Sequence, residues 1–472
     1  MRRLVAVSLT AAALAGCTVG PKYSRPPVPA PDRYYGMRAP AEEASLANRP
    51  WWDLFSDPVL RTLVDEALVN SYDVRIAAAR VEEARGRYGV AGGSWYPAVS
   101  YGAGVVRGKT STYSATGDAT GNLINGGAAV TWELDLWGRI RYLNEAARAQ
   151  LFASEEARRG VELTLVSEVA SAYFDLRALD EELEIGRRMR AAFQDTYDLF
   201  SRRLEGGAGS ALETSRAEAL LANASGDIPL VERRIVAKEN QIALLLGRAP
   251  GPIARGAALN EQPLPPAVPT VPAGLPSTLL LRRPDLRQAE QELIAANATV
   301  GVAHASLFPT LALTGFFGGQ SPQLSDLLTA GKAWSIGAGI VGPLFQGGSL
   351  RAQERVAQAR FDAARLAYER AVNQALGEVS TSLVAMQRLA EEEAERARAV
   401  SATREAVRLS TMRYESGFSA YFEVLDALQQ ALVSETVLVV TRRNRLVELS
   451  SFYKALGGGW DPSGKGSAPP AR

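Results

Sequence analysis

The chain has 472 residues, of which 47% are hydrophobic and 22% charged, and its 52 Lys and Arg nearly balance its 51 Asp and Glu. A net charge of +1 gives no electrostatic reason to expect a nucleic-acid partner. Beyond the N-terminus no run reaches the ~18 apolar residues that a membrane-spanning helix needs, which excludes a helical membrane protein.

The N-terminus has the pattern of a bacterial lipoprotein. Two arginines and an apolar stretch lead to the sequence LAG directly before Cys17, the only cysteine. We expect residues 1–16 to be an export signal that is removed, and the Cys17 thiol to receive a lipid, because it stands where a lipobox places the acceptor. A chance cysteine closing an ordinary signal peptide is the alternative. Thr18 stands where an inner-membrane retention signal has Asp, which favours the outer membrane.

An extended segment and a helix come next. Residues 17–57 are rich in proline and predict a lipidated tether. Asp57 is the expected N-cap of a helix that starts at Pro58. Apolar residues recur every three or four positions as far as Ala91, so one side of this helix should pack on other helices.

Apolar residues then alternate with small or polar ones, which predicts two strands. The first runs from Trp95 to Val106, and the second through AVTWELDLW (129–137). Glu133 and Asp135 share the polar face of the second strand, which we expect to line the lumen of a barrel.

A long helical hairpin follows the strands. From about Arg139 to Leu204 there is no proline, and a helix of this length would measure about 100 Å. The glycines of EGGAGS predict a reversal, after which a second helix returns to about Leu246.

The whole pattern then occurs again about 210 residues later, with Gly207 and Glu213 corresponding to Gly417 and Glu423. Strands are expected at residues 307–314 and 334–340, and the second long helix has the apolar seam of a coiled coil. The expected segments are a signal (1–16), a tether (17–57), a first repeat (58–247), a proline-rich connector (248–278), a second repeat (279–456) and a C-terminal tail (457–472).

The four predicted strands resemble strands of an outer-membrane barrel, since each is amphipathic and about ten residues long. A soluble sandwich is the alternative on pattern alone. Four strands cannot close a membrane barrel, because an open edge leaves backbone groups unpaired in lipid. Several chains should therefore contribute to one barrel.

The chain resembles the outer membrane factors of the TolC/OprM type, in the lipoprotein branch called NodT-like. The resemblance covers nearly all of the mature chain. It rests on WWDLFSDPVLRTLVDEAL, WELDLWGRIR, LPSTLLLRRPDLRQAE, ASLFPTLALTGFFG, GPLFQGGSLRAQ, RYESGF followed by VLDA, and FYKALGGGW. It implies an α+β membrane protein: a homotrimeric channel with a twelve-stranded outer-membrane β-barrel, four strands per chain, continued by a coiled-coil α-helical tunnel in the periplasm. The connector and the terminal segments would form an equatorial belt.

The resemblance implies that this channel is the passive duct of a tripartite efflux or export system in Gram-negative bacteria, as in multidrug resistance. Its partners would be a periplasmic adaptor, an inner-membrane pump of the RND type and outer-membrane lipids. Apart from a lipid such as palmitate on Cys17, no cofactor, metal or catalytic residue is expected. The cargo and the cognate pump stay open.

The glycine turns would lie at the periplasmic tip, where the tunnel narrows. The resemblance assigns the gate to Phe422, Glu423, Asp426 and, in the first repeat, Glu213. These acids could instead be ordinary helix-start carboxylates that stabilise the helix dipole. An arginine that locks the TolC branch is replaced by Ser419, which leaves a salt-bridge lock open. The substitutes near in sequence are Arg203, Arg216 and Arg413.

Two other classes of protein remain as alternatives. A periplasmic adaptor would have one helical hairpin flanked by soluble β modules, whereas this chain has its hairpin and strands twice. A lipid-anchored enzyme would need a convergent set of titratable groups, and His304 is the only histidine.

Overall fold

A computed structural model describes residues 19–28, 31, 34–35, 57–109, 120–262, 279–280 and 282–458. The predicted signal, Cys17 and the tail from residue 459 lie outside the described residues. The chain forms two compact units. Unit 1 comprises residues 1–27, 80–155 and 288–369, and unit 2 comprises residues 28–79, 156–287 and 370–472.

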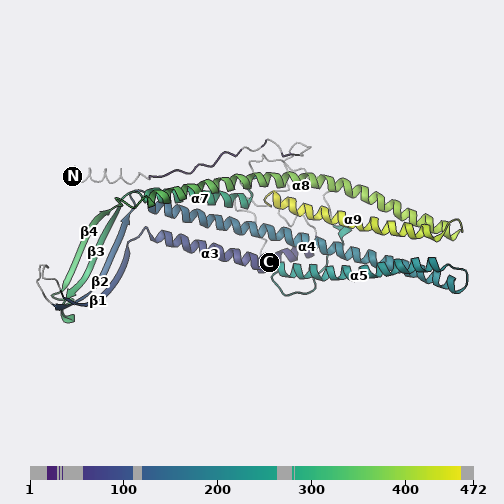
Figure 1. The fold of residues 1–472 in the computed structure, drawn as a ribbon, viewed down its shortest axis with the longest axis horizontal. Helices are drawn as coiled ribbons and strands as arrows, with labels where there is room; N and C mark the ends of the chain where they lie inside the picture. The colour runs from purple at the N-terminus through teal and green to yellow at the C-terminus, as the bar shows by residue number, and fades with distance from the viewer. Residues whose placement is uncertain are drawn as a thin grey trace. The chain divides into compact units, whose positions relative to one another are not determined.

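Unit 1 contains an antiparallel sheet whose strand order follows the sequence (Figure 1). The strands are β1 (Ala98–Lys109), β2 (Thr120–Leu134), β3 (Thr310–Ser321) and β4 (Lys332–Val341). The alternating pattern found all four strands but misplaced their ends. β1 starts after Pro97, which has no amide proton to donate to a ladder, and not at Trp95.

The two faces of the sheet differ in side-chain size. Residues directly opposite each other across a strand pair share a face. Val99 is paired with Val130, Trp132 with Leu313, and Leu313 with Ala338. The apolar face carries Val99, Tyr101, Val105, Val130, Trp132, Leu311, Leu313, Phe317, Trp334, Ile336 and Ile340. The other face carries mostly small residues, namely Ser100, Gly102, Gly127, Ala129, Ala312, Thr314, Ser335, Gly337 and Gly339, and also the larger Glu133 and Phe316.

Of the two acids predicted on the second strand, Glu133 lies on the expected face, opposite Ala312, whereas Asp135 does not lie on the strand. Glu133 is on β2, and its carboxylate forms an ion pair with Arg139 at 2.7 Å. Asp135 lies beyond the end of β2, where it accepts hydrogen bonds from the backbone N–H groups of Ile140 at 2.9 Å and Arg141 at 3.0 Å. The prediction of a strand residue was wrong for Asp135, because unpaired N–H groups of a helix start attract a carboxylate.

Helices continue from the sheet in unit 1. They are the later part of α3 (Tyr72–Gly93), α7 (Pro284–Ala305) from Gln288, and the beginnings of α4 (Arg139–Glu205) and α8 (Ser349–Glu415). Val81 and Ala84 of α3 pack on Leu151 of α4, as the apolar spacing predicted.

The N-terminal segment is extended, as predicted, but it is bound to unit 1. The Arg25 guanidinium donates to both carboxylate oxygens of Glu290 on α7, each at 2.6 Å, and the Tyr23 hydroxyl donates to the same carboxylate at 3.2 Å. The backbone N–H of Val19 donates to the carbonyl of Trp137 at 3.2 Å. Residues 19–25 are therefore fixed along the unit.

Unit 2 contains two helical hairpins (Figure 1). The first joins α4 to α5 (Ala211–Leu245), and the second joins α8 to α9 (Tyr421–Ala455). The predicted seam of α8 is buried at Val372, Val379, Leu383 and Met386. Of the described helices, α9 alone is apolar and long enough to cross a bilayer, which the search for apolar runs missed. Its side chains pack in unit 2, where Leu425 meets Met189 and Phe193 of α4.

The helix expected from Pro58 to Ala91 is interrupted. α2 (Pro58–Asn70) ends at Ser71, whose backbone is extended with ψ 134°, and α3 begins at Tyr72. Helical periodicity continues across the break, which is why the sequence did not reveal it. Asp57 is the N-cap, as predicted, and accepts from the N–H groups of Val59 at 2.9 Å and Leu60 at 3.3 Å.

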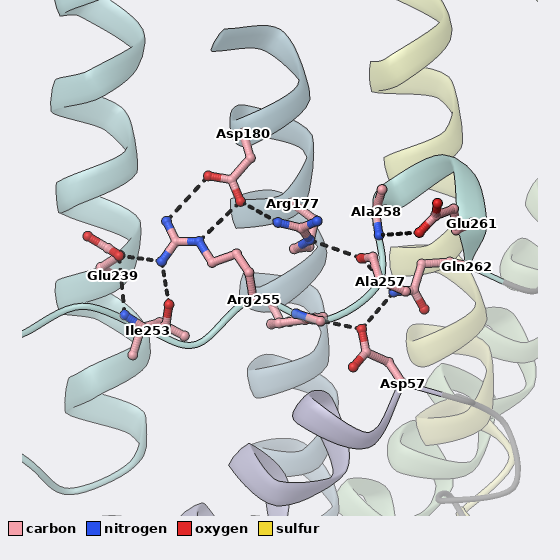
Figure 2. A network of polar contacts seen from close by, with 12 residues as sticks. Asp57, Arg177, Asp180, Glu239, Ile253, Arg255, Ala257, Ala258, Glu261 and Gln262 are labelled. Carbon is pink, nitrogen blue, oxygen red and sulfur yellow. Dashed lines mark hydrogen bonds and ion pairs between the residues drawn. The ribbon is translucent and has the colours of Figure 1, made fainter. Parts of the chain in front are cut away.

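A polar network attaches the start of the connector to unit 2 (Figure 2). Arg255 bridges Asp180 of α4 and Glu239 of α5, with a closest contact of 2.5 Å to Glu239. Asp57, which is 2% exposed, accepts from the Tyr173 hydroxyl and the Gln262 amide, both at 2.7 Å. Residues 251–262 are thereby held between α2, α4 and α5.

Candidate functional site

Both hairpins of unit 2 reverse direction through the same backbone arrangement. In the first, the N–H of Gly207 donates to the carbonyl of Leu204 and the N–H of Ala208 to that of Arg203. In the second, Gly417 donates to Tyr414 and Phe418 to Arg413. Gly207 and Gly417 have φ of 75° and 77°, a left-handed conformation that favours glycine. The predicted pair of glycine turns is confirmed.

Glu213 closes the first turn as part of a capping box. Its carboxylate accepts from the backbone N–H of Ser210 at 3.3 Å, while the Ser210 hydroxyl accepts from the N–H of Leu212 at 3.2 Å. Glu213 thus has the helix-start contact named as the alternative, while its place in the gate stays a prediction.

The other three predicted gate residues lie together on the exposed side of α9. Phe422 is 59% exposed, and Glu423 and Asp426 are exposed too, whereas the intervening Val424 and Leu425 are buried. Asp426 accepts from the amide of Gln430 at 2.7 Å, a bond within α9. All three side chains are therefore on the exposed surface of the helix.

The three predicted arginines have different surroundings. Arg413 forms an ion pair with Glu423 at 3.4 Å, but both side chains are about half exposed, so the pair is weak. Arg216 lies over the ring of Phe422 at 5.8 Å, and Arg203 over the ring of Tyr414 at 5.5 Å. Only Arg413 forms an ion pair with a predicted gate acid.

Tyr421 is not among the predicted gate residues, yet it contacts both α4 and α8. Its hydroxyl is 2.8 Å from that of Thr196, and its ring meets those of Phe200 and Tyr414 edge to face. One signal was available: the first repeat has Ala211 at the matching helix start, so the aromatic ring is specific to the second.

Farther from the turns, buried charge connects three helices. Glu435 of α9 is 7% exposed and forms ion pairs with Arg188 of α4 at 2.5 Å and Arg404 of α8 at 2.7 Å. These residues line a cavity of about 1050 Å³ together with Glu181. Burial raises the pKa of the Glu181 carboxyl, although Arg442 and two other arginines oppose the shift.

The described residues contain no group of three or more His, Cys, Asp or Glu that could hold a metal ion. His304 lies at the end of α7, and its Nδ1 is 2.6 Å from the carboxylate of Glu354. At the start of α9 the exposed side chains thus include one aromatic ring and two carboxylates, Phe422, Glu423 and Asp426.

Comparison with known proteins identifies the family. A family model described as outer membrane efflux protein matches residues 63–248 and 275–458, which is most of the chain. The chain belongs to the outer membrane efflux protein family.

Members of this family from several bacteria resemble the chain over nearly its full length. The probable efflux pump outer membrane protein TtgC of Pseudomonas putida is 32% identical over 468 residues, covering 97% of this chain and 96% of the relative. The cation efflux system protein CusC of Escherichia coli is 32% identical over 453 residues, covering 95% and 97%. The open state of the MtrE channel of Neisseria gonorrhoeae superposes with a TM-score of 0.83 at 32% identity, covering 94% of this chain and 98% of that one.

Membership confirms the predicted family, fold, location and function. The protein is an outer-membrane efflux channel of the TolC-like fold, with four strands per chain, an internal repeat and a periplasmic helical tunnel. Members of the family form trimers, work with an adaptor and an inner-membrane pump, and are channels rather than enzymes.

Proposed function

We propose that this channel is the passive duct of an efflux system driven by an RND-type pump, and that Phe422, Glu423 and Asp426 form its periplasmic gate. Each of the three copies in a trimer would place these side chains around one axis. Rings of carboxylates attract cations, and a ring of phenylalanine narrows the opening. The observation that carries the proposal is their shared exposure on the first two turns of α9, beside buried neighbours.

The cargo follows from the pump rather than from the duct. Relatives with the same 32% identity are described as antibiotic, toluene and cation efflux proteins. The described residues of the small-residue face are mostly Gly, Ala, Ser and Thr, which do not select one of these classes. We therefore propose drugs, toxic organic compounds or metal ions as cargo, according to what the pump delivers.

We also propose that Cys17 carries the covalent lipid. Support comes from the lipobox and from the bound N-terminal segment. Val19, two residues after Cys17, is hydrogen-bonded to Trp137, which lies shortly after β2. The described chain is therefore held against unit 1 from Val19 onward.

The first prediction tests the gate. Replacing Phe422, Glu423 and Asp426 together with Ala should raise single-channel conductance in planar bilayers and weaken cation selectivity, since the ring of charge and the narrowing side chain are both removed. Cells with the variant should admit large antibiotics.

The first repeat supplies the matched control. Leu212 and Glu213 correspond to Phe422 and Glu423, and replacing them with Ala and Gln should change conductance and selectivity less, because the Glu213 carboxylate is bound to the backbone of Ser210. An intact trimer of the triple variant with wild-type conductance and selectivity would remove the three residues from the gate.

A further inference from the structure

Tyr421 is placed to tie the second hairpin to the first at the tip. It is the first residue of α9, and the N-cap before it, Ala420, makes no side-chain cap. Its hydroxyl lies 2.8 Å from the hydroxyl of Thr196 on α4. Thr196 is 1% exposed and donates its one proton to the carbonyl of Ala192 at 2.8 Å. The Tyr421 hydroxyl must therefore be the donor in the bond to Thr196.

The ring of Tyr421 adds contacts on two sides. Its centroid is 5.1 Å from that of Phe200 on α4 and 4.7 Å from that of Tyr414 on α8, with interplanar angles of 81° and 73°. Edge-to-face pairs at these distances are attractive. A single side chain thus connects α9 to α4 and α8 through one hydrogen bond and two aromatic contacts.

The Tyr421–Thr196 contact is one of several side-chain contacts between α9 and α4, and it is the one nearest the turn. Farther along α9, Glu435 pairs with Arg188, Arg443 with Asp175, and the Ser450 hydroxyl donates to Ser167. The numbers rise on α9 as they fall on α4, so the helices are antiparallel and Tyr421 lies nearest the turn. If the hairpin swings about its far end, the contact nearest the turn separates most.

Other contacts at the tip are poor candidates for this role. Arg413 and Glu423 both belong to the second hairpin, so their ion pair cannot tie it to α4. The hydroxyl of Ser419, the residue at the position of the expected arginine, is buried and has no hydrogen-bond partner. Among the described residues, Arg203 and Arg216 contact the other hairpin through the rings of Tyr414 and Phe422.

We propose that the Tyr421–Thr196 contact is the latch of the closed channel, and that it takes the place of the arginine lock missing at Ser419. The inference rests on the proposed function, because it assumes that the second hairpin moves to open the tip. Tyr421 is a positioning residue: it fixes α9 in the closed state and thereby fixes the gate side chains that follow it.

The second prediction tests this latch with substitutions that remove single hydroxyl groups. In planar bilayers Tyr421→Phe should increase the ratio of open to closed channel about tenfold per broken bond. Thr196→Val should have a similar effect, and the double variant should resemble either single one, because all three lose the same bond. Thr196→Ser should restore wild-type gating, since it keeps the hydroxyl.

Tyr414→Phe is the matched control, because the Tyr414 hydroxyl is buried without a hydrogen-bond partner. It should leave gating unchanged in an intact trimer. The latch is overturned if Tyr421→Phe and Thr196→Val gate like the wild type, if their effects add in the double variant, or if Tyr414→Phe opens the channel as much. Failure here is separable from failure of the gate: opening by the Phe422, Glu423 and Asp426 variant alone would keep the gate and discard the latch.

Discussion

Two glutamates in unit 2 show that the partners of a carboxylate decide whether its charge stabilises or destabilises the folded state. Glu435 is almost fully buried but has an arginine on each side. Glu181 lines the same cavity, and its Oε2 is buried without a hydrogen-bond partner. Burial raises the pKa of Glu181, whereas the nearby Arg442, Arg177 and Arg188 lower it. Ionisation of Glu181 therefore costs free energy in the folded state.

The third prediction follows from the raised pKa of Glu181. A glutamate whose folded pKa is raised contributes stability below its ordinary pKa of 4.5, and this stability is lost as pH rises through the folded pKa. Glu181→Gln should therefore raise the thermal unfolding midpoint at pH 7 by about 1 °C and leave it unchanged near pH 4. Glu184→Gln, on an exposed side chain of the same cavity, is the control and should show no such difference. A lower midpoint for Glu181→Gln at pH 7 would mean that its arginine neighbours outweigh burial.

At the scale of elements, the sheet separates two chemical surfaces by alternation alone. Ile336 is 84% exposed on the apolar face, and its neighbour Ser335 is on the small-residue face. In an outer-membrane barrel the apolar face contacts lipid and the other lines the lumen. This assignment agrees with the family to which the chain belongs.

The fourth prediction uses these two neighbours. Ile336→Arg should reduce the free energy of unfolding by ~2–4 kcal/mol if residue 336 is near the bilayer midplane, because a guanidinium would replace an apolar side chain in lipid. Ser335→Arg places the same group on the lumen face and should cost much less. Unfolding by urea in lipid vesicles measures both, and equal losses would contradict the assignment of faces.

The sequence predicted elements and faces better than their ends and contacts. Apolar alternation identified the apolar face from Val99 to Ile340. The absence of proline identified the first long helix, and the repeat with its coiled-coil seam identified the second. The sequence could not show that Ser71 interrupts a periodic helix, or that Asp135 belongs to a helix start, since both depend on backbone direction. Tyr421 meets Thr196 across 225 residues, and no local pattern encodes such a contact.

At the scale of the whole molecule, the sheet explains why one chain cannot close a membrane barrel. Among the described strands, β1 and β4 each pair on one side only. Unpaired backbone groups at such edges are costly in lipid, so the edges must pair with other chains. The trimer of the family supplies these neighbours and closes a barrel of twelve strands.

The fifth prediction compares how strongly the barrel and the lipid hold the protein in the outer membrane. Cys17→Ala behind a signal that is still cleaved should lose the acyl chains but remain in the outer membrane, because twelve strands bury more apolar surface than three lipid anchors. Membrane fractionation, palmitate labelling and light scattering in mild detergent should show an unlabelled particle of three chains. A soluble periplasmic monomer would contradict the dominance of the barrel, and a palmitate-labelled variant would remove Cys17 as the acceptor.

Because α5 and α9 start differently, the two copies of the repeat can have different roles in opening the channel. α5 is fastened within its own hairpin by Ser210 and Glu213, whereas α9 begins at an uncapped Ala420 and relies on Thr196 of the neighbouring hairpin. Duplication alone would give a ring of equivalent hairpins, which would have to move together or not at all. Because the two copies differ at these few positions, hairpins stabilised by their own cap alternate around the ring with hairpins stabilised by a neighbour. The first hairpin of each chain can therefore keep its conformation while the second hairpin moves.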